Sequence, residues 1–209
     1  MGLLSKKNKE VLVGPLSINN PVIVQMLGIC SALGVTSKLE PALVMGISVT
    51  AVVAFANVII SLLRNTIPSR IRIIVQLVVV AALVTIASEV LKAYAYDVNK
   101  QLSVFVGLIF TNFILMGRLV AFALGNGPWE SFLDGVGNGL GYAVILVIVG
   151  FFRELFGSGT LFGVQVIPQV FYDWGYVNNG LMILPPMALI VIVVIIWVHR
   201  SRNKELQEN

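Results

Sequence analysis

The sequence predicts an all-α membrane protein whose six transmembrane helices form two inverted three-helix repeats, the first helix of each repeat being short or broken. The first observation is composition: 57% of the 209 residues are hydrophobic and 11% are charged, whereas soluble domains carry about 25% charged residues. Helices are favoured because lipid cannot satisfy an open sheet edge. The second observation is six apolar segments, at about 21–36, 41–63, 71–93, 102–122, 136–156 and 178–198. We expect a single membrane domain over 1–209, with repeat halves of about 15–97 and 98–200.

The first and fourth segments are too short for ordinary spans. Each has roughly 15 unbroken apolar residues, whereas a helix needs about 20 to cross the hydrocarbon core. Cys30 precedes Gly34 by four residues, and Phe113 precedes Gly117 by four. Short, glycine-marked segments at matching places in two halves indicate a site near the bilayer midplane. Three spans per half is an odd number, so the halves are expected to have opposite orientations.

The other segments are long enough to cross. Pro185 and Pro186 lie inside the sixth segment and predict a kink there. Gly137 and Gly141 open the fifth segment with the spacing that lets two helix backbones approach closely. The loop 157–177 carries Trp and Tyr residues typical of a membrane interface.

Basic residues predict the orientation. With six crossings, ten of the 14 basic residues lie on the side of the chain ends and four on the other side. The positive-inside rule then places both termini in the cytoplasm. The larger group comprises Lys6, Lys7, Lys9, Arg64, Arg70, Arg72, Arg118, Arg200, Arg202 and Lys204; the smaller one comprises Lys38, Lys92, Lys100 and Arg153.

Several polar residues lie in or near the apolar segments. Those close to predicted helix ends are interpreted as interfacial, because their side chains can reach water there; they include Arg118, Glu130, Asp134, Arg153 and Glu154, together with a possible helical pair, Glu89 and Lys92. Four deeper amides either line a path for a cation or bond between helices: Asn57, Gln76, Asn112 and Asn138.

Composition argues against other classes of function. No basic stripe is interleaved with aromatic residues, so nucleic-acid binding is not expected. The polar first twenty residues predict no cleavable signal peptide. With one cysteine the chain forms no internal disulfide, and His199, the one histidine, is at the far end, which argues against a zinc site.

Cys30 has two interpretations. A thiol in a membrane span is usually a small apolar residue. The functional alternative is a thiolate ligand to a soft metal or an iron–sulfur centre. Such a centre takes four ligands, and this chain offers one cysteine. Any such cluster would have to be shared with another subunit.

The chain resembles a known family along 15–198. The motifs that carry the likeness are LGICSAL with VT at 27–36, LSVFVGLI at 102–109, TN at 111–112, MGR at 116–118, SFLDG at 131–135, GNGLGY at 137–142, GFFRELFGSG at 150–159 and NGLM at 179–182. They resemble the D subunits of sodium-translocating NADH:quinone oxidoreductases. The related E-type subunits of Rnf electron-transport complexes are the nearest alternative.

The resemblance implies a membrane subunit of a redox-driven sodium pump in the bacterial inner membrane, passing electrons from NADH to quinone and catalytic only within its complex. It also implies a partner, the homologous six-helix E subunit, and an intramembrane [2Fe–2S] cluster between the two subunits. Each subunit would supply one cysteine from its first span and one from its fourth. In this chain the first position is Cys30. The flavins of the complex would belong to other subunits.

The chain departs from the family at two positions. Phe113 stands where the second cysteine is expected, and Val120 where the family usually has glutamate. Phenylalanine offers no atom to iron, so Phe113 is not expected to ligate. The cluster is then lost or altered, or Ser31 or Asn112 substitutes as a ligand, or the chain keeps only the scaffold. A transporter without a redox role and a purely structural subunit remain open as well.

Overall fold

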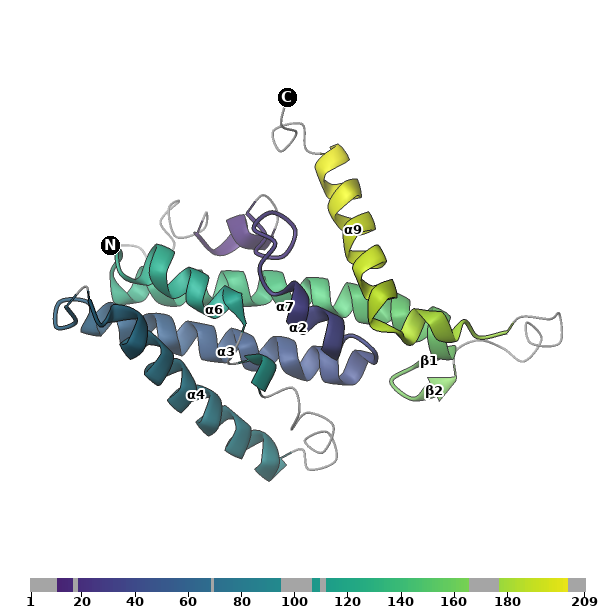
Figure 1. Ribbon diagram of the computed structural model, residues 1–209, viewed down its shortest axis with the longest axis horizontal. Coiled ribbons are helices and arrows are strands. Elements are labelled where there is room, and N and C mark those ends of the chain that lie inside the picture. The colour runs from purple at the N-terminus through teal and green to yellow at the C-terminus, as the bar shows by residue number, and fades with distance from the viewer. Residues whose placement is uncertain are drawn as a thin grey trace.

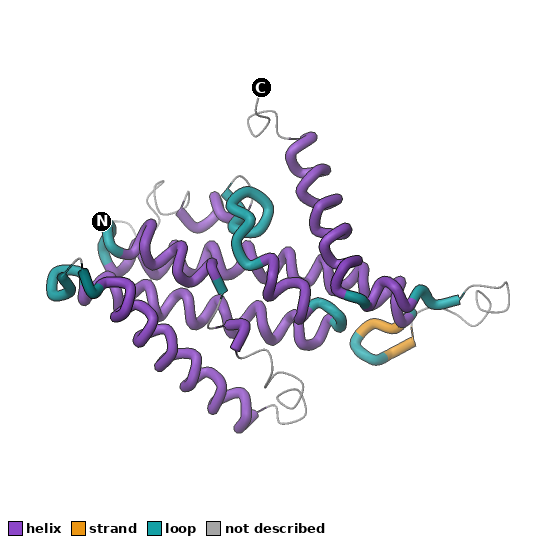
Figure 2. Tube along the Cα trace, viewed as in Figure 1, coloured by secondary structure: helices purple, strands orange, loops and turns teal. Residues whose placement is uncertain are grey.

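The computed structural model describes residues 11–16, 19–68, 70–94, 107–109, 112–165 and 177–202. Two long helices, α3 (Leu39–Leu63) and α7 (Pro128–Ser158), lie side by side along its long axis (Figure 1). Around them lie the short helices α2 (Ile29–Val35) and α6 (Phe113–Arg118), the longer α4 (Arg72–Tyr94) and α9 (Pro185–Arg202), and a small hairpin (Figure 2). The remaining elements are η1 (Gly14–Leu16), the π-helix η2 (Leu119–Ala123), β1 (Thr160–Leu161), β2 (Val164–Gln165) and η3 (Gly180–Ile183).

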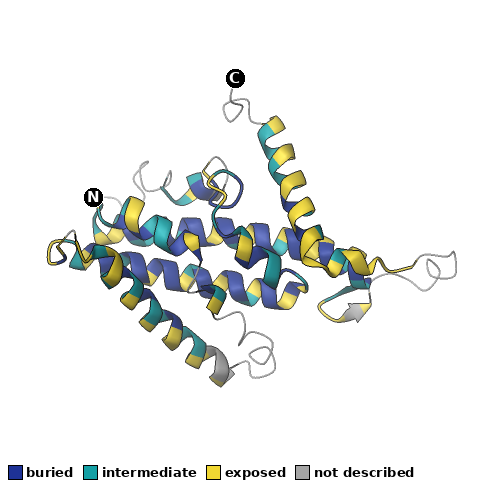
Figure 3. Cartoon of the chain, viewed as in Figure 1, coloured by how far each residue is buried: buried dark blue, intermediate teal, exposed yellow. Residues whose placement is uncertain are grey.

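Glycine brings the α3 and α7 backbones together. A Cβ atom placed on Gly139 would lie 2.5 Å from Thr50 Cα, and one on Gly135 would lie 2.7 Å from Ala54 Cα. From the other side, a Cβ on Gly46 would lie 2.7 Å from Ala143 Cβ. The paired positions run in opposite directions along the two helices, which are therefore antiparallel. Most of the buried residues lie along this pair (Figure 3).

The two glycines that open the fifth segment pack against the N-terminal segment and not against another long helix. Their spacing predicts a close backbone approach but does not identify the neighbour. Gly137 and Gly141 face the N-terminal segment: a Cβ on Gly137 would lie 2.8 Å from the Leu12 carbonyl oxygen, and one on Gly141 would lie 2.6 Å from the Pro15 carbonyl oxygen. The glycines that face α3 are two residues away from them, on another face of α7.

This packing gives a direct stability prediction. We expect Gly139→Ala to destabilise the protein by about 1–3 kcal/mol, because the added methyl group meets backbone atoms that cannot rotate away. Gly150→Ala is the matched control: its Cβ would lie 3.4 Å from Ala42 Cβ, an ordinary contact, and alanine gains up to about 1 kcal/mol of helix propensity. Thermal unfolding midpoints in detergent measure both variants. Equal midpoints would contradict the close approach.

Four helices in the described part are long and apolar enough to cross a membrane: α3, Arg72–Val90 of α4, α7 and α9. Of the most apolar stretch of each, 56% is buried in α3 and in α7, but only 17% in α4 and 11% in α9. The two less buried helices diverge from the central pair (Figures 1 and 3). Their exposed apolar side chains suit contact with lipid or with another subunit.

Two predicted helix starts are corrected. The fifth helix begins at Pro128 after Gly127, eight residues before the expected start at 136, because proline is well suited to the first helical position. Asp134 therefore lies inside α7 rather than in a loop. Pro185 likewise begins α9 and produces no kink in a longer span. The predicted loop 157–177 contains the hairpin, and its aromatic residues at 172 and 174 lie outside the described residues.

The first and fourth apolar segments contain the short helices α2 and α6. α2 has 7 residues, follows the non-helical residues 21–28 and is capped at Gly28, whose φ of 79° is left-handed. α6 has 6 residues, is capped by the Asn112 side chain and continues into the π-helix η2. Residues 102–106 and 110–111 of the fourth segment lie outside the described residues.

Candidate functional site

The N-terminal ends of α2 and α6 meet. A Cβ on Gly28 would lie 2.7 Å from Ile114 Cδ1 and 3.1 Å from Asn112 Oδ1. A side chain at position 28 would clash with α6, and the left-handed backbone there also favours glycine. On the α6 side, Asn112 Oδ1 accepts a hydrogen bond from the backbone N–H of Ile114 at 3.2 Å. The two caps thus pack against each other.

Cys30 and Phe113 line one small pocket at this meeting point. The pocket has a volume of about 70 Å³, and its other lining residues are Met26, Gly28, Ile29, Ser31, Leu108 and Asn112. Cys30 is exposed, and Phe113 has 65% of its surface exposed. The two positions singled out by the sequence are therefore close together, at a surface of this chain that another subunit could reach.

A buried hydroxyl group of α7, that of Tyr142, contacts Ser31, the residue that follows Cys30. Ser31 Oγ donates to the Gly28 carbonyl oxygen at 2.8 Å and lies 2.7 Å from the Tyr142 hydroxyl oxygen. Tyr142 is fully buried. Sequence reasoning missed this residue. The available signal was a polar aromatic residue directly after the glycine-rich start of the fifth segment.

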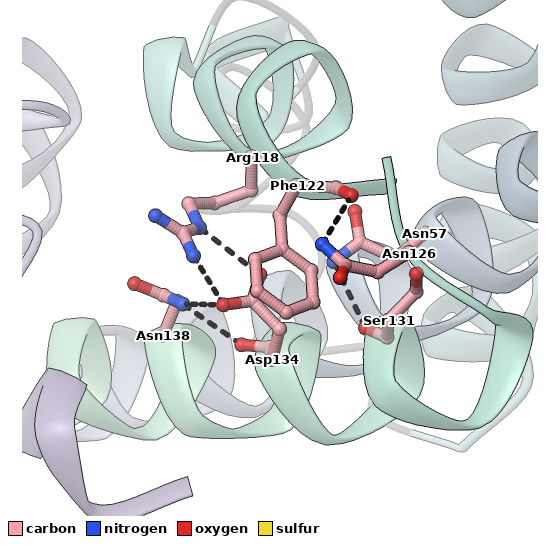
Figure 4. Close-up of polar contacts among 7 residues, drawn as sticks. All are labelled: Asn57, Arg118, Phe122, Asn126, Ser131, Asp134 and Asn138. Carbon is pink, nitrogen blue, oxygen red and sulfur yellow. Dashed lines mark hydrogen bonds and ion pairs between the residues drawn. The ribbon is translucent and has the colours of Figure 1, made fainter. Parts of the chain in front are cut away.

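A second polar cluster joins α6 to α7 (Figure 4). Arg118, the last residue of α6, makes two hydrogen bonds to the Asp134 carboxylate: Nε to Oδ2 at 3.0 Å, and Nη2 to Oδ1. Asn138 Nδ2 donates to Asp134 Oδ1 at 3.0 Å and to the Asp134 carbonyl oxygen at 2.9 Å. Arg118 also lies over the Phe122 ring, with 5.6 Å between its Cζ and the ring centroid.

The interfacial interpretation of Asp134 is wrong. Its side chain is only 2% exposed, and it forms part of the wall of a cavity of about 340 Å³. Asn138 is fully buried and lines the same cavity; its Oδ1 has no hydrogen-bond partner among the described residues. The other lining residues are Val11, Gly14, Pro15, Asn19, Gln25, Arg118 and Phe122.

Arg153 is also buried rather than interfacial, with 1% of its surface exposed. Its Nε donates to the Met182 carbonyl oxygen at 3.0 Å, and its Nη2 to the Ile183 carbonyl oxygen at 2.6 Å. Its Nη1 donates to Thr36 Oγ1 at 2.5 Å and to the Leu33 carbonyl oxygen at 3.3 Å. One guanidinium thus links α7 to the end of α2 and to the segment before α9.

Glu154 is a third charged residue whose interfacial interpretation fails. It is 3% exposed, and its Oε2 accepts a hydrogen bond from the backbone N–H of Leu39 at 2.6 Å. A carboxylate at this position satisfies a donor that the start of α3 would otherwise leave unpaired. The predicted pair of Glu89 and Lys92 is not tested, because the Lys92 side chain lies outside the described residues.

The four amides predicted to lie deep are all buried, as expected: Asn57, Gln76, Asn112 and Asn138. Asn57 Nδ2 bonds across the helix pair to the Ser131 carbonyl oxygen at 3.1 Å. Neither polar atom of the Gln76 side chain has a hydrogen-bond partner within the described ranges. Helix-to-helix bonding is thus observed for Asn57.

Comparison with known proteins identifies the family to which this chain belongs. The family model described as "Rnf-Nqr subunit, membrane protein" matches residues 8–196. The chain belongs to the Rnf-Nqr family. It is 55% identical over 204 residues to proteins from Shewanella sp. (strain W3-18-1) and Shewanella putrefaciens, each named as the D subunit of a Na(+)-translocating NADH-quinone reductase; the match covers 98% of this chain and 97% of each relative. A Shewanella baltica protein of the same name is 54% identical with the same coverage.

The residues of this Rnf-Nqr chain fit one ligand of a shared iron–sulfur centre and not two. The Cys30 thiol is exposed at the pocket, whereas Phe113 brings only a hydrocarbon ring. The two substitute ligands are already engaged: the Ser31 hydroxyl donates to Gly28, and Asn112 Oδ1 caps α6. Within the described residues, no group of three or more His, Cys, Asp or Glu side chains could hold a metal.

Proposed function

We propose that this chain is the D-type membrane subunit of a sodium-translocating NADH:quinone reductase and that Cys30 supplies one thiolate to an intramembrane [2Fe–2S] centre shared with another subunit. The observation that carries the proposal is the exposure of Cys30 beside position 113, where two short helices meet. A thiolate is the protein ligand that iron–sulfur centres take. Such a centre carries single electrons when bound, and the flavins of the complex belong to other subunits.

The element order supports an inverted repeat with six crossings. Each half has a short helix followed by two long ones: α2, α3 and α4, then α6, α7 and α9. The middle helices of the halves pack antiparallel, which is the arrangement that opposite insertion requires. In this arrangement α2 and α6 enter from opposite sides and meet near the midplane. Both termini then lie in the cytoplasm, on the side with more basic residues.

The partner that fits best is the homologous six-helix E subunit. A [2Fe–2S] centre takes four ligands, and this chain has one cysteine. The remaining thiolates must therefore come from outside the chain, and the exposed thiol faces outward. On this side the chain would also restrict water at the shared centre through three apolar residues of the pocket: Met26, Leu108 and Phe113.

The test is the iron content of the purified complex. The chain should be purified with its natural partners in mild detergent, and iron per complex measured together with the reduced-minus-oxidised visible spectrum. We expect iron and a spectrum that bleaches on reduction. A fully assembled, active complex without iron would reject the shared centre.

A second prediction isolates Cys30. We expect Cys30→Ala to leave the complex assembled, because the side chain is small and exposed, and to remove the iron–sulfur absorbance. The matched control is Ser48→Ala, which removes a hydroxyl that bonds within α3, to the Val44 carbonyl oxygen at 2.8 Å. Iron analysis and NADH:quinone activity are the measurements. Retained iron with full activity would reject the assignment.

A scaffold role without a redox centre is the second candidate function. It is favoured by Phe113, which cannot ligate metal at the second family position. In that case Cys30 is a small apolar residue and the chain serves assembly and the barrier between the two sides of the membrane. The same iron measurement separates the candidates, because a scaffold predicts no change in iron between the parent complex and Cys30→Ala.

A further inference from the structure

Two buried polar residues flank the positions that form the candidate site. Ser31 directly follows Cys30, and Asn112 directly precedes Phe113. Their exposed fractions are 3% and 2%. Tyr142, fully buried on α7, lies within hydrogen-bond distance of Ser31 and near Asn112. One residue of the central helix pair therefore bonds to the flank of Cys30 and lies near the flank of Phe113.

Tyr142 donates the hydrogen bond that joins it to Ser31. Ser31 Oγ carries a single hydrogen, which is donated to the Gly28 carbonyl oxygen. In the 2.7 Å contact between Ser31 and Tyr142, Tyr142 is therefore the donor. The phenol group thus holds the first turn of α2, through Ser31, at the residue next to Cys30.

Asn112, at the start of α6, carries a hydrogen-bond donor near the Tyr142 hydroxyl group. The Asn112 amide is held in one orientation because its Oδ1 accepts from Ile114. Its Nδ2 is buried and has no hydrogen-bond partner in the part of the chain that the structure describes. The Tyr142 oxygen retains acceptor capacity. Asn112 Nδ2 and the Tyr142 oxygen are thus a donor and an acceptor on the α6 side that make no hydrogen bond with each other in the described structure.

The short helices need such support. α2 has 7 residues and no side-chain cap, and α6 has 6 residues. Helices of this length have little stability of their own. In contrast, α7 has 31 residues and is packed tightly against α3 through Gly135 and Gly139. A rigid helix that bonds to the first turn of α2 can set the place of Cys30 relative to α6.

We propose that Tyr142 is a positioning residue of the candidate site: its hydroxyl group, acting through Ser31, fixes Cys30 relative to position 113. This proposal deepens the proposed function and rests on it for the role of Cys30 as a ligand. Tyr142 touches neither the thiol nor a bound group directly. Its effect is on the geometry and uniformity of the centre, and assembly does not depend on it.

The first test uses the complex with its natural partners. Tyr142→Phe keeps the ring and removes the hydrogen bond, and Ser31→Ala removes the same bond from the other end. We expect both variants to assemble normally, with at least a twofold broadening of the electron paramagnetic resonance lines of the reduced centre. The double variant should be no broader than either single variant, and Ser48→Ala should match the parent.

The second test does not need the centre. Cys30 is the chain's only cysteine, so with Phe113→Cys and iron removed by a chelator, nitroxide labels attach to this chain at those two exposed positions alone. We expect a narrow distance distribution with Tyr142 present, and one at least twice as wide with Tyr142→Phe or Ser31→Ala. Ser48→Ala in the same background is again the control.

The outcomes separate the two proposals. Absence of iron from the parent complex rejects the shared centre, whereas the label distances still test Tyr142. Unchanged line widths and unchanged distance distributions in both Tyr142→Phe and Ser31→Ala overturn the positioning role alone. An equal effect of Ser48→Ala overturns it too, because the effect would then not be specific to this network.

Discussion

Arg118→Leu should destabilise the folded protein by about 3–5 kcal/mol, because it leaves a buried carboxylate without its cation. Asp134 is only 2% exposed, and both of its carboxylate oxygens accept hydrogen bonds from Arg118. Asn138 donates to the same carboxylate but carries no charge to balance it. Unfolding midpoints of the purified protein in detergent, with the yield of assembled complex, measure the effect.

The double variant gives the sharper test. Replacing both Arg118 and Asp134 with leucine removes the pair without leaving a lone charge, and such replacements are often neutral or stabilising. We therefore expect the double variant to recover most of the stability lost by Arg118→Leu. Arg70→Leu, at an exposed position, is the matched control for loss of a positive charge. If the single and double variants are equally unstable, the ion pair is not what holds α6 against α7.

The long helices could be predicted from hydrophobicity and length. The segments 41–63 and 71–93 correspond to α3 (Leu39–Leu63) and α4 (Arg72–Tyr94). The starts of α7 and α9 could not be located in this way, because proline and polar residues lower hydropathy at helix starts where local geometry favours them. Pro128 and Pro185 mark both errors.

The burial of the charged residues could not be predicted because their partners are fixed only by the fold. Arg118 and Asp134 lie 16 residues apart on different helices. Arg153 bonds mainly to backbone carbonyl groups, which leave no trace in the identity of the residues that carry them. A hydropathy average along the sequence places each charged residue at a helix end. In the folded chain the same residue is buried, and an ion pair or hydrogen bonds compensate its charge.

The candidate site was predicted in part. Matching short segments with glycine four residues after Cys30 and Phe113 indicated that these positions meet, and both line the same pocket. Tyr142 was not found, because its contact with Ser31 joins residues 111 positions apart. The closeness of Gly28 to Asn112 depends in the same way on how the folded chain brings the two short helices together.

Arg153→Leu should cost about 3 kcal/mol, because one buried and three part-buried acceptors lose a charged donor, and a hydrogen bond to a charged group contributes about 1.5–3 kcal/mol. The acceptors are the carbonyl oxygens of Leu33, Met182 and Ile183 and the Thr36 hydroxyl. Arg153→Lys should recover only part of this, since an ammonium group lacks the planar fork that reaches both segments.

Arg153→Leu should loosen one part of the fold in addition to lowering the stability of the whole chain. Arg153 links the end of α2 to the segment before α9, so its loss should release these two parts while the α3–α7 pair, packed through glycine, stays together. Limited proteolysis should then cut near residues 180–184 well before the chain unfolds, and the thermal midpoint should fall. Arg202→Leu, at an exposed position on α9, is the control and should change neither. Cleavage at the parent rate in Arg153→Leu would show that packing, and not the guanidinium, holds α9 at the core.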